Sequence, residues 1–187
     1  MTDHPDPSAL LLDISRAVSS TLNLQELLKL LSQRTAAACG ADVCSIFLRD
    51  PSGERLVPMM SQTASGEQMD ELWEQFKQLG GQRGKHIVPI LATIERGTPI
   101  VLDDPATSPL LLAEWVEMFQ LKALLSVPLI RQDVVIGALV LHQMTDGKRF
   151  TEAQVLLAST IASQVALSIE NARLFQAHSE RVYGPRH

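Results

Sequence analysis

Hydrophobic and polar positions follow their clearest pattern in the C-terminal third of the chain. Residues 122–130 and 134–143 are two apolar runs separated by a short polar turn, which predicts a β-hairpin. A segment with helical spacing follows from 152 to 176 and would extend about 37 Å at 1.5 Å per residue. Thr151 and Gln154 form a capping-box pattern at its start. A hairpin followed by so long a helix indicates a module that connects a sheet to whatever lies beyond it.

The rest of the chain supplies further helices and strands. Helical spacing predicts helices over 8–21, 24–39, 66–79, 88–96 and 110–119, and apolar runs predict strands over 43–49, 56–62 and 99–102. Because strands joined by short turns pair antiparallel, we expect an α+β fold with a central antiparallel sheet of five to six strands. We divide the chain into a disordered tail (1–7), one domain (8–176) and a C-terminal tail (177–187).

The predicted long helix carries a heptad-like seam of apolar and small residues. The seam consists of Ala158, Ala162, Val165, Ile169 and Ala172. Two interpretations remain open at this point. The seam covers the domain's own sheet, or it is the interface of a homodimer in which the first and last helices of two subunits form a bundle.

Composition and charge exclude several classes of partner. The 187 residues suffice for a sizeable core, and 45% of them are hydrophobic. A net charge of −5 without a cluster of Lys and Arg argues against nucleic acid. No uninterrupted apolar run reaches the roughly 18–20 residues that cross a bilayer, and the N-terminus lacks the pattern of a secretory signal. With only two cysteines, a disulfide framework is not expected, and we predict a cytoplasmic protein without membrane insertion.

Residue patterns for catalysis are absent from the sequence. No His and Cys spacing matches a zinc site, so no metal is expected. The segment from Gly80 to His86 lacks the first Gly and the final Ser or Thr of a phosphate-binding loop. We interpret Cys39 and Cys44 as small buried hydrophobic residues. The domain is therefore predicted not to be an enzyme.

Ser126 is the polar side chain within an otherwise apolar strand. Because side chains alternate along a strand, Ser126 shares one face with Leu124 and Pro128. If that face lines a pocket, the hydroxyl can orient a ligand; otherwise it makes a local hydrogen bond. Both alternatives remain open.

Several segments resemble the GAF domain family when they are taken in order. LLSVPLI, VVIGALVLHQM and RFTEAQVLLASTIASQVALSIENARLF resemble the C-terminal half of the family, and LQELLKLLSQRTAAACGADVCSIFLRD and IERGTPIVLDD resemble earlier elements. The resemblance covers residues 8–175. It implies terminal helices on one face of the sheet, and loops and short helices around a small-molecule pocket on the other. It also implies a sensing domain of a signalling protein, such as a sensor histidine kinase.

The resemblance suggests which residues bind the ligand. It places Ile90, Thr93 and the turn of Asp103 and Asp104 near the pocket. We add Ser126 from its strand and Trp115 as a side chain that covers the pocket. The two aspartates have an alternative role as turn formers before Pro105, and Trp115 as part of the core.

The ligand itself remains unknown. Family members that carry a covalent bilin attach it through a Cys, and residues 110–121 contain none, so no covalent bilin is expected. Of the family's cyclic-nucleotide motif, Asn-Lys, Phe and Asp-Glu, only Phe150 is matched. Haem would need His86 or His142 as an axial ligand and is not supported. Three functions follow: a small-molecule sensor that acts through its terminal helices, a ligand-free dimerisation and relay module, and, remotely, a thiol-dependent reductase of the GAF fold.

Overall fold

The structure is a computed structural model that describes residues 12, 24–53, 55–67, 70, 74 and 88–183. The helices expected over 8–21 and 66–79 lie almost entirely outside the described residues. The tail expected over 1–7 and the segment from Gly80 to His86 lie outside them as well.

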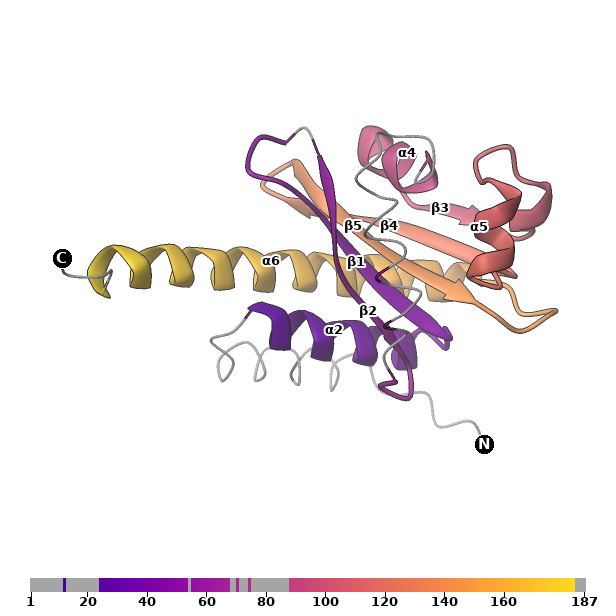
Figure 1. Cartoon of the computed structure of the whole chain (residues 1–187), viewed down its shortest axis with the longest axis horizontal. Coiled ribbons are helices and arrows are strands. Elements are labelled where there is room, and N and C mark those ends of the chain that lie inside the picture. The colour runs from indigo at the N-terminus through magenta and orange to yellow at the C-terminus, as the bar shows by residue number, and fades with distance from the viewer. Residues whose placement is uncertain are drawn as a thin grey trace.

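Figure 1 shows a sheet between two layers of helices. In chain order the elements are α2 (Leu24–Ala38), β1 (Val43–Arg49), β2 (Leu56–Thr63), α4 (Val88–Arg96), β3 (Ile100–Leu102), the 3-10 helix η1 (Pro105–Thr107), α5 (Ala113–Met118), β4 (Ala123–Arg131), β5 (Val134–Gln143) and α6 (Glu152–Tyr183). The five strands lie in the order β2-β1-β5-β4-β3, and all neighbours are antiparallel. The predicted α+β class and antiparallel sheet are confirmed.

The β4–β5 hairpin has the tight turn that its sequence predicts. Gln132 and Asp133 both have positive φ, 49° and 64°, as a two-residue type I′ turn requires. Farther along β5, Gly137 pairs with Leu48 of β1. A Cβ at Gly137 would collide with the carbonyl oxygen of Phe47, so glycine lets these two strands approach.

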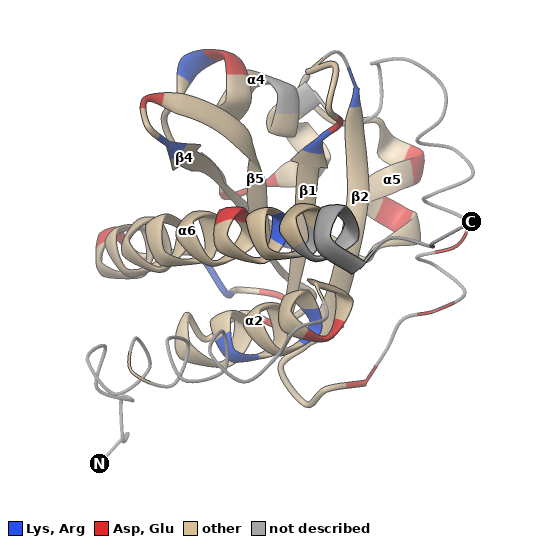
Figure 2. Cartoon of the chain, turned by 90° about the vertical axis from the view of Figure 1, so that its left-hand side faces the viewer, with Lys and Arg blue, Asp and Glu red and all other residues tan. Residues whose placement is uncertain are grey.

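Helices α2 and α6 cover one face of the sheet, as Figures 1 and 2 show. Aliphatic side chains from both helices and from alternate strand positions form the main core there. Its largest members, each less than 2% exposed, include Leu27, Leu31, Leu125, Leu139, Ile161 and Ile169. Burial of each such side chain contributes about 1.5–3 kcal/mol, which makes this layer the chief source of stability.

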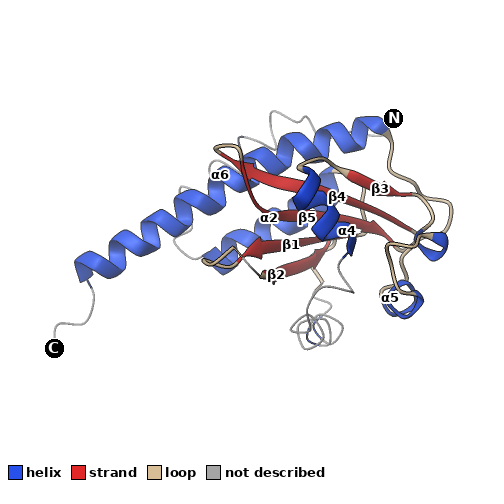
Figure 3. Ribbon diagram, turned by 90° about the horizontal axis from the view of Figure 1, so that it is seen from above, coloured by secondary structure: helices blue, strands red, loops and turns tan. Residues whose placement is uncertain are grey.

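Helices α4 and α5 lie on the opposite side of the sheet, which we call the α4 face (Figure 3). A smaller cluster is buried there, with Phe47, Ile90, Ile94, Trp115, Leu121, Leu124, Ala138 and Val140 as its members. The two-layer arrangement that the family resemblance implied is thus present. Strands β4 and β5 contribute alternate side chains to both clusters.

Most element boundaries agree with the sequence pattern, and two differ. Helix α5 begins at Ala113 rather than at 110 because Leu112 is extended, with φ −78° and ψ 139°. Helix α6 continues to Tyr183, so residues 177–183 are helical and not the tail expected there. No Gly or Pro occurs between Gln176 and Tyr183 to end the helix earlier.

The start of α6 has the predicted capping box. The Thr151 amide donates to Gln154 Oε1 at 2.8 Å, and the Gln154 amide donates to Thr151 Oγ1 at 3.2 Å. Gln154 Nε2 also donates to the carbonyl oxygen of Cys39, just past α2, at 2.8 Å. This side chain therefore joins the beginning of α6 to the end of α2.

Candidate functional site

Ser126 lies on the α4 face of β4. It pairs with Val140 of β5 and is two residues from Leu124, and both of these belong to the cluster under α4 and α5. The flanking residues Leu125 and Val127 point the other way, into the core beneath α2 and α6. Ser126 therefore faces the predicted ligand region, whereas its two neighbours along β4 pack beneath the terminal helices.

Two buried polar atoms on the α4 face have no hydrogen-bond partner among the described residues. They are Ser126 Oγ and His142 Nε2. Because His142 pairs with Leu124 and Ser126 with Val140, the two side chains are diagonal neighbours on this face, about 7–8 Å apart by the geometry of such pairs. Burial lowers the pKa of His142 to about 4, against a smaller opposite effect of Asp42, so the imidazole is neutral. The pair offers neutral polar groups in apolar surroundings.

Three other predicted ligand residues are buried on the same side of the sheet. Ile90 and Trp115 belong to the core of the α4 face, and the Trp115 ring stacks on Phe119 with ring centroids 5.4 Å apart. Thr93 is fully buried, but its hydroxyl donates to the Pro89 carbonyl oxygen within α4 at 3.0 Å. Of the polar candidates, Ser126 is thus the one with a hydroxyl left over for a ligand.

Asp103 and Asp104 lie at the surface after β3 and are both exposed. Asp104 precedes η1 and lines a pocket of about 530 Å³ at the edge of the α4 face. Asp103 is not among its lining residues. The structure therefore separates the predicted residues into a buried group under α4 and α5 and one carboxylate in a neighbouring surface pocket.

The two cysteines lie on the other side of the sheet from Ser126. Cys39 and Cys44 are free thiols in the core beneath α2 and α6. Burial raises the pKa of Cys39 to about 12 and raises the pKa of Cys44 well above its usual value. Their interpretation as small hydrophobic residues is confirmed, because a buried neutral thiol is a poor nucleophile.

The positions of the partly matched cyclic-nucleotide motif have a structural role in this chain. Gln143 Nε2 donates to the Gly40 carbonyl oxygen at 2.8 Å, next to the bond from Gln154 to Cys39. Gly40 itself has φ +62°, as a residue that ends a helix often does. The two glutamines therefore hold the C-terminal end of α2 against both β5 and α6.

Asp42 extends this junction to the loop that precedes α6. Its carboxylate accepts from the Met144 amide at 2.7 Å and forms an ion pair with Lys148 Nζ at 3.1 Å. Burial acts to raise the pKa of Asp42, but the Met144 and Lys148 interactions, with a further hydrogen bond from the Thr145 backbone, outweigh it and leave the pKa below its usual value. The end of α2, the end of β5 and the start of α6 are thus fastened together.

The seam predicted as a dimer interface lies mostly inside the chain's own core. Ala158, Ala162, Val165 and Ile169 are fully buried in the single chain, and Ala172 packs at the edge of the same cluster. This burial is what the alternative of a helix covering its own sheet predicts. Among the described side chains of α6, the large apolar ones that are exposed are Leu156, Leu174 and Phe175, at 70%, 64% and 51%.

Helix α6 is also long and apolar enough to cross a membrane by length and composition. Within Glu152–Phe175, an 18-residue window has a mean hydropathy of 1.2. The apolar side chains of this segment include Ile161, Val165 and Ile169, all buried against the sheet. Packing against the sheet therefore explains why many residues of α6 are apolar.

Two features of the α4 side could not be found from the sequence. The unpartnered nitrogen of His142 is visible only once Leu124 and His142 are paired. The surface pocket joins Asp104 to residues near 120 and near 147, and no periodicity links these segments. Among the described residues, no group of three or more His, Cys, Asp or Glu side chains is arranged to hold a metal ion.

Comparison with known proteins agrees with this architecture. The GAF domain family model matches residues 23–169. The GAF domain of a phosphoenolpyruvate-protein phosphotransferase from Coxiella burnetii is similar, with 24% identity, TM-score 0.70, and coverage of 94% of this chain and 99% of that one.

Two further solved structures share the fold and differ in function. A free methionine-R-sulfoxide reductase from Neisseria meningitidis has 17% identity and TM-score 0.65, with 90% of each chain covered. A domain of a putative two-component sensor histidine kinase from Sinorhizobium meliloti has 19% identity and TM-score 0.63, with 84% of this chain and 98% of that one covered. The family match and the arrangement of sheet and helices together show that this chain belongs to the GAF domain family.

Proposed function

We propose that the domain is a non-catalytic sensor in which a small molecule bound on the α4 face changes the packing of the terminal helices. The observation that carries the proposal is the Ser126 hydroxyl, fully buried and without a hydrogen-bond partner among the described residues. A buried hydroxyl left unpaired costs about 1–3 kcal/mol. A ligand atom that pairs with it recovers this free energy on binding.

Strand β4 provides the route from the ligand to α6. A displacement of Ser126 also displaces Leu125 and Val127, whose side chains lie in the core that α6 covers. At the end of the strand, Arg131 Nε forms an ion pair with Glu170 of α6. The ligand can shift the equilibrium between two packing arrangements of α6 only by the difference between its binding free energies for those arrangements.

Family membership supports a regulatory role, and the cysteines argue against the reductase alternative. The GAF fold also occurs in a reductase, so the fold alone does not decide between the two. This chain has two cysteines, and both lie in the core away from the α4 face, with raised pKa values. Free thiols of this kind also fit a reducing compartment such as the cytoplasm.

The dimerisation and relay module is the second candidate, and exposed residues of α6 favour it. Leu156 and Leu174 are 18 residues apart, which is five helical turns, so they lie on the same side of the helix. Both are more than half exposed. A homodimer would form along the side of α6 that carries Leu156 and Leu174. The seam from Ala158 to Ala172 would stay in the core of each subunit.

A thermal-shift screen of nucleotides, cyclic nucleotides, haem and metabolites tests the sensor proposal. A ligand should raise the melting temperature of the wild-type domain in a dose-dependent way. The Ser126→Ala variant should respond less, whereas Ser163→Ala, at an exposed position of α6, should respond like the wild type.

The stability of the ligand-free variant provides a second result from the same experiment. Because the substitution removes an unpaired hydroxyl, Ser126→Ala without ligand should melt at the wild-type temperature or above it. A clear loss of stability would show that the hydroxyl is already paired inside the domain. Such a loss, or an equal ligand response in both variants, would contradict the proposal.

A further inference from the structure

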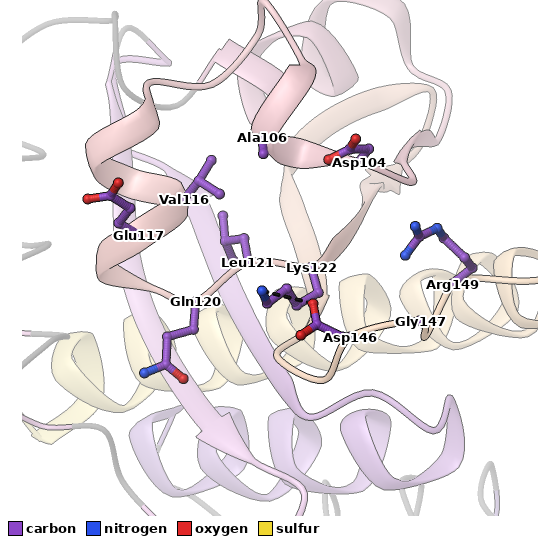
Figure 4. Close-up of a pocket in the computed structure, with 10 residues that line it drawn as sticks. All are labelled: Asp104, Ala106, Val116, Glu117, Gln120, Leu121, Lys122, Asp146, Gly147 and Arg149. Atoms are coloured by element: carbon purple, nitrogen blue, oxygen red, sulfur yellow. Dashed lines mark ion pairs between the residues drawn. The ribbon is translucent and has the colours of Figure 1, made fainter.

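The pocket of about 530 Å³ lies at the edge of the α4 face, apart from Ser126. We call it the α5 pocket, and the residues that line it are Asp104, Ala106, Val116, Glu117, Gln120, Leu121, Lys122, Asp146, Gly147 and Arg149. They come from the η1 region, from α5 and the turn after it, and from the loop between β5 and α6 (Figure 4). Its volume falls within the usual range of about 300–1,000 Å³ for small-molecule sites.

Apolar and charged groups occupy different parts of the α5 pocket. Ala106, Val116 and Leu121 project into the space between α5 and η1 in Figure 4. Lys122 Nζ and Asp146 Oδ1 form an ion pair at 2.9 Å and largely neutralise each other. The surface for a ligand is therefore an apolar floor beside one solvent-exposed ion pair.

Asp104, Glu117 and Arg149 contribute the charges that remain. The Asp104 and Arg149 side chains point inward over the pocket in Figure 4, whereas Glu117 and Gln120 point toward its outer edge. Arg149 uses Nη1 to donate to the Lys148 carbonyl oxygen at 3.0 Å, which leaves its other N–H groups for a ligand. Asp104 is the N-cap residue of η1, but its carboxylate accepts no capping hydrogen bond from that helix. The carboxylate also has no ion pair with any described residue.

These charges favour a ligand that carries both signs. An anion alone would face the Asp104 carboxylate, and a cation alone would face the Arg149 guanidinium (Figure 4). The carboxylate of a zwitterion can accept hydrogen bonds from the Arg149 guanidinium, and its ammonium group can donate to the Asp104 carboxylate. An apolar side chain of the same ligand can then pack on Val116 and Leu121. We propose that the α5 pocket is a second ligand site, for a small zwitterion with an apolar side chain such as an α-amino acid.

The position of the α5 pocket gives such binding a consequence. Gly147 and Arg149 form its wall, and the loop to which they belong leads directly into the capping box of α6. Lys148 in the same loop pairs with Asp42 near the end of α2. A ligand there would order the connection between β5 and α6, and so act on the same helix as the Ser126 site without using Ser126.

Isothermal titration calorimetry of the full chain with L-leucine and L-phenylalanine tests this inference. At least one of them should bind, and its methyl ester and its N-acetyl derivative should both bind more weakly, since each lacks one of the two charges. Arg149→Gln and Asp104→Asn should each weaken binding roughly tenfold or more, the loss expected for one charge-assisted hydrogen bond.

Matched variants separate the α5 pocket from its surroundings and from the Ser126 site. Asp103→Asn removes an adjacent exposed carboxylate that does not line the pocket, and Arg173→Gln removes an exposed cation of α6. Both should bind like the wild type, and so should Ser126→Ala. Absence of binding by both amino acids, equal losses in Asp103→Asn and Asp104→Asn, or undiminished binding of the N-acetyl derivative would each overturn the proposal. Loss of binding in Ser126→Ala would overturn the claim of two separate sites.

Discussion

Ile169 provides a test of whether the seam of α6 is a core or a dimer interface. The residue is fully buried in the single chain, within the cluster beneath the sheet. Ile169→Glu removes its packing, which costs about 2–5 kcal/mol. It also buries a carboxyl group, and burial of this kind can raise the pKa of a Glu from about 4.3 to about 8–9.

The electrostatic part of the cost depends on pH. At about 1.4 kcal/mol per pKa unit, the raised pKa destabilises the variant by about 5 kcal/mol at pH 8, because pH 8 lies roughly 3.7 units above the unfolded pKa of the carboxyl. The two costs together reach about 7–10 kcal/mol, comparable with the usual total stability of about 5–15 kcal/mol for a domain. Because the folded-state pKa of the new carboxyl is raised, its cost falls as pH falls toward the unfolded value near 4.3. Ile169→Glu should therefore be largely unfolded at pH 8 and recover part of its stability at pH 5.

Urea unfolding followed by circular dichroism, together with light scattering, measures this result. Gln164→Glu introduces the same group at an exposed position of α6, and it should unfold within about 0.5 kcal/mol of the wild type. If Ile169→Glu is folded, monomeric and as stable as Gln164→Glu, then Ile169 lies at a subunit interface and the core described above is wrong.

Three further predictions concern the junction and the buried polar groups. Gln154→Ala should lower the free energy of unfolding by about 1–2 kcal/mol, since it removes the bond from the Thr151 amide to Gln154 Oε1 and the bond to the Cys39 carbonyl oxygen. Gln164→Ala, at an exposed position, should change the free energy of unfolding little, and equal effects would contradict the role of Gln154. The His142 imidazole should titrate near pH 4 by NMR, and a midpoint near 6.5 would show that the ring is not buried. Because its pKa is lowered on folding, its contribution to the free energy of unfolding should be full above about pH 6.5 and decrease as pH falls toward 4. Cys39 and Cys44 should both react with dithionitrobenzoate only after unfolding, and rapid reaction in the native domain would refute their burial.

The elements that the sequence predicts well are those with a strong local signal. The apolar runs of β4 and β5 flank two polar residues that adopt the left-handed conformation, so the hairpin follows from residues close in the chain. The start of α6 follows from Thr151 and Gln154, whose mutual hydrogen bonds are local as well. The face of β4 on which Ser126 lies follows from strand alternation, once α2 and α6 are known to cover the face of Leu125 and Val127.

Features that depend on distant contacts do not follow from such signals. The seam of α6 has the same spacing whether it packs on its own sheet or on another subunit, so periodicity alone left Val165 and Ile169 undecided. The α5 pocket requires Asp104 and Arg149 to meet, and they are separated in sequence by η1, α5, β4 and β5. The pattern predicts too short an α6 because its apolar spacing stops near 176, although residues 177–183 contain no Gly or Pro to end the helix.

In the proposed function, a ligand on the α4 face acts on α6 through β4. Hydrogen-exchange mass spectrometry can test it with the compound that most stabilises the wild-type domain in the thermal-shift screen. We predict that this compound changes amide exchange in β4 and also in α6 over residues 152–170, and that Ser126→Ala diminishes both changes. Changes confined to α4, α5 and β3, with α6 exchanging at its ligand-free rate, would contradict the claim.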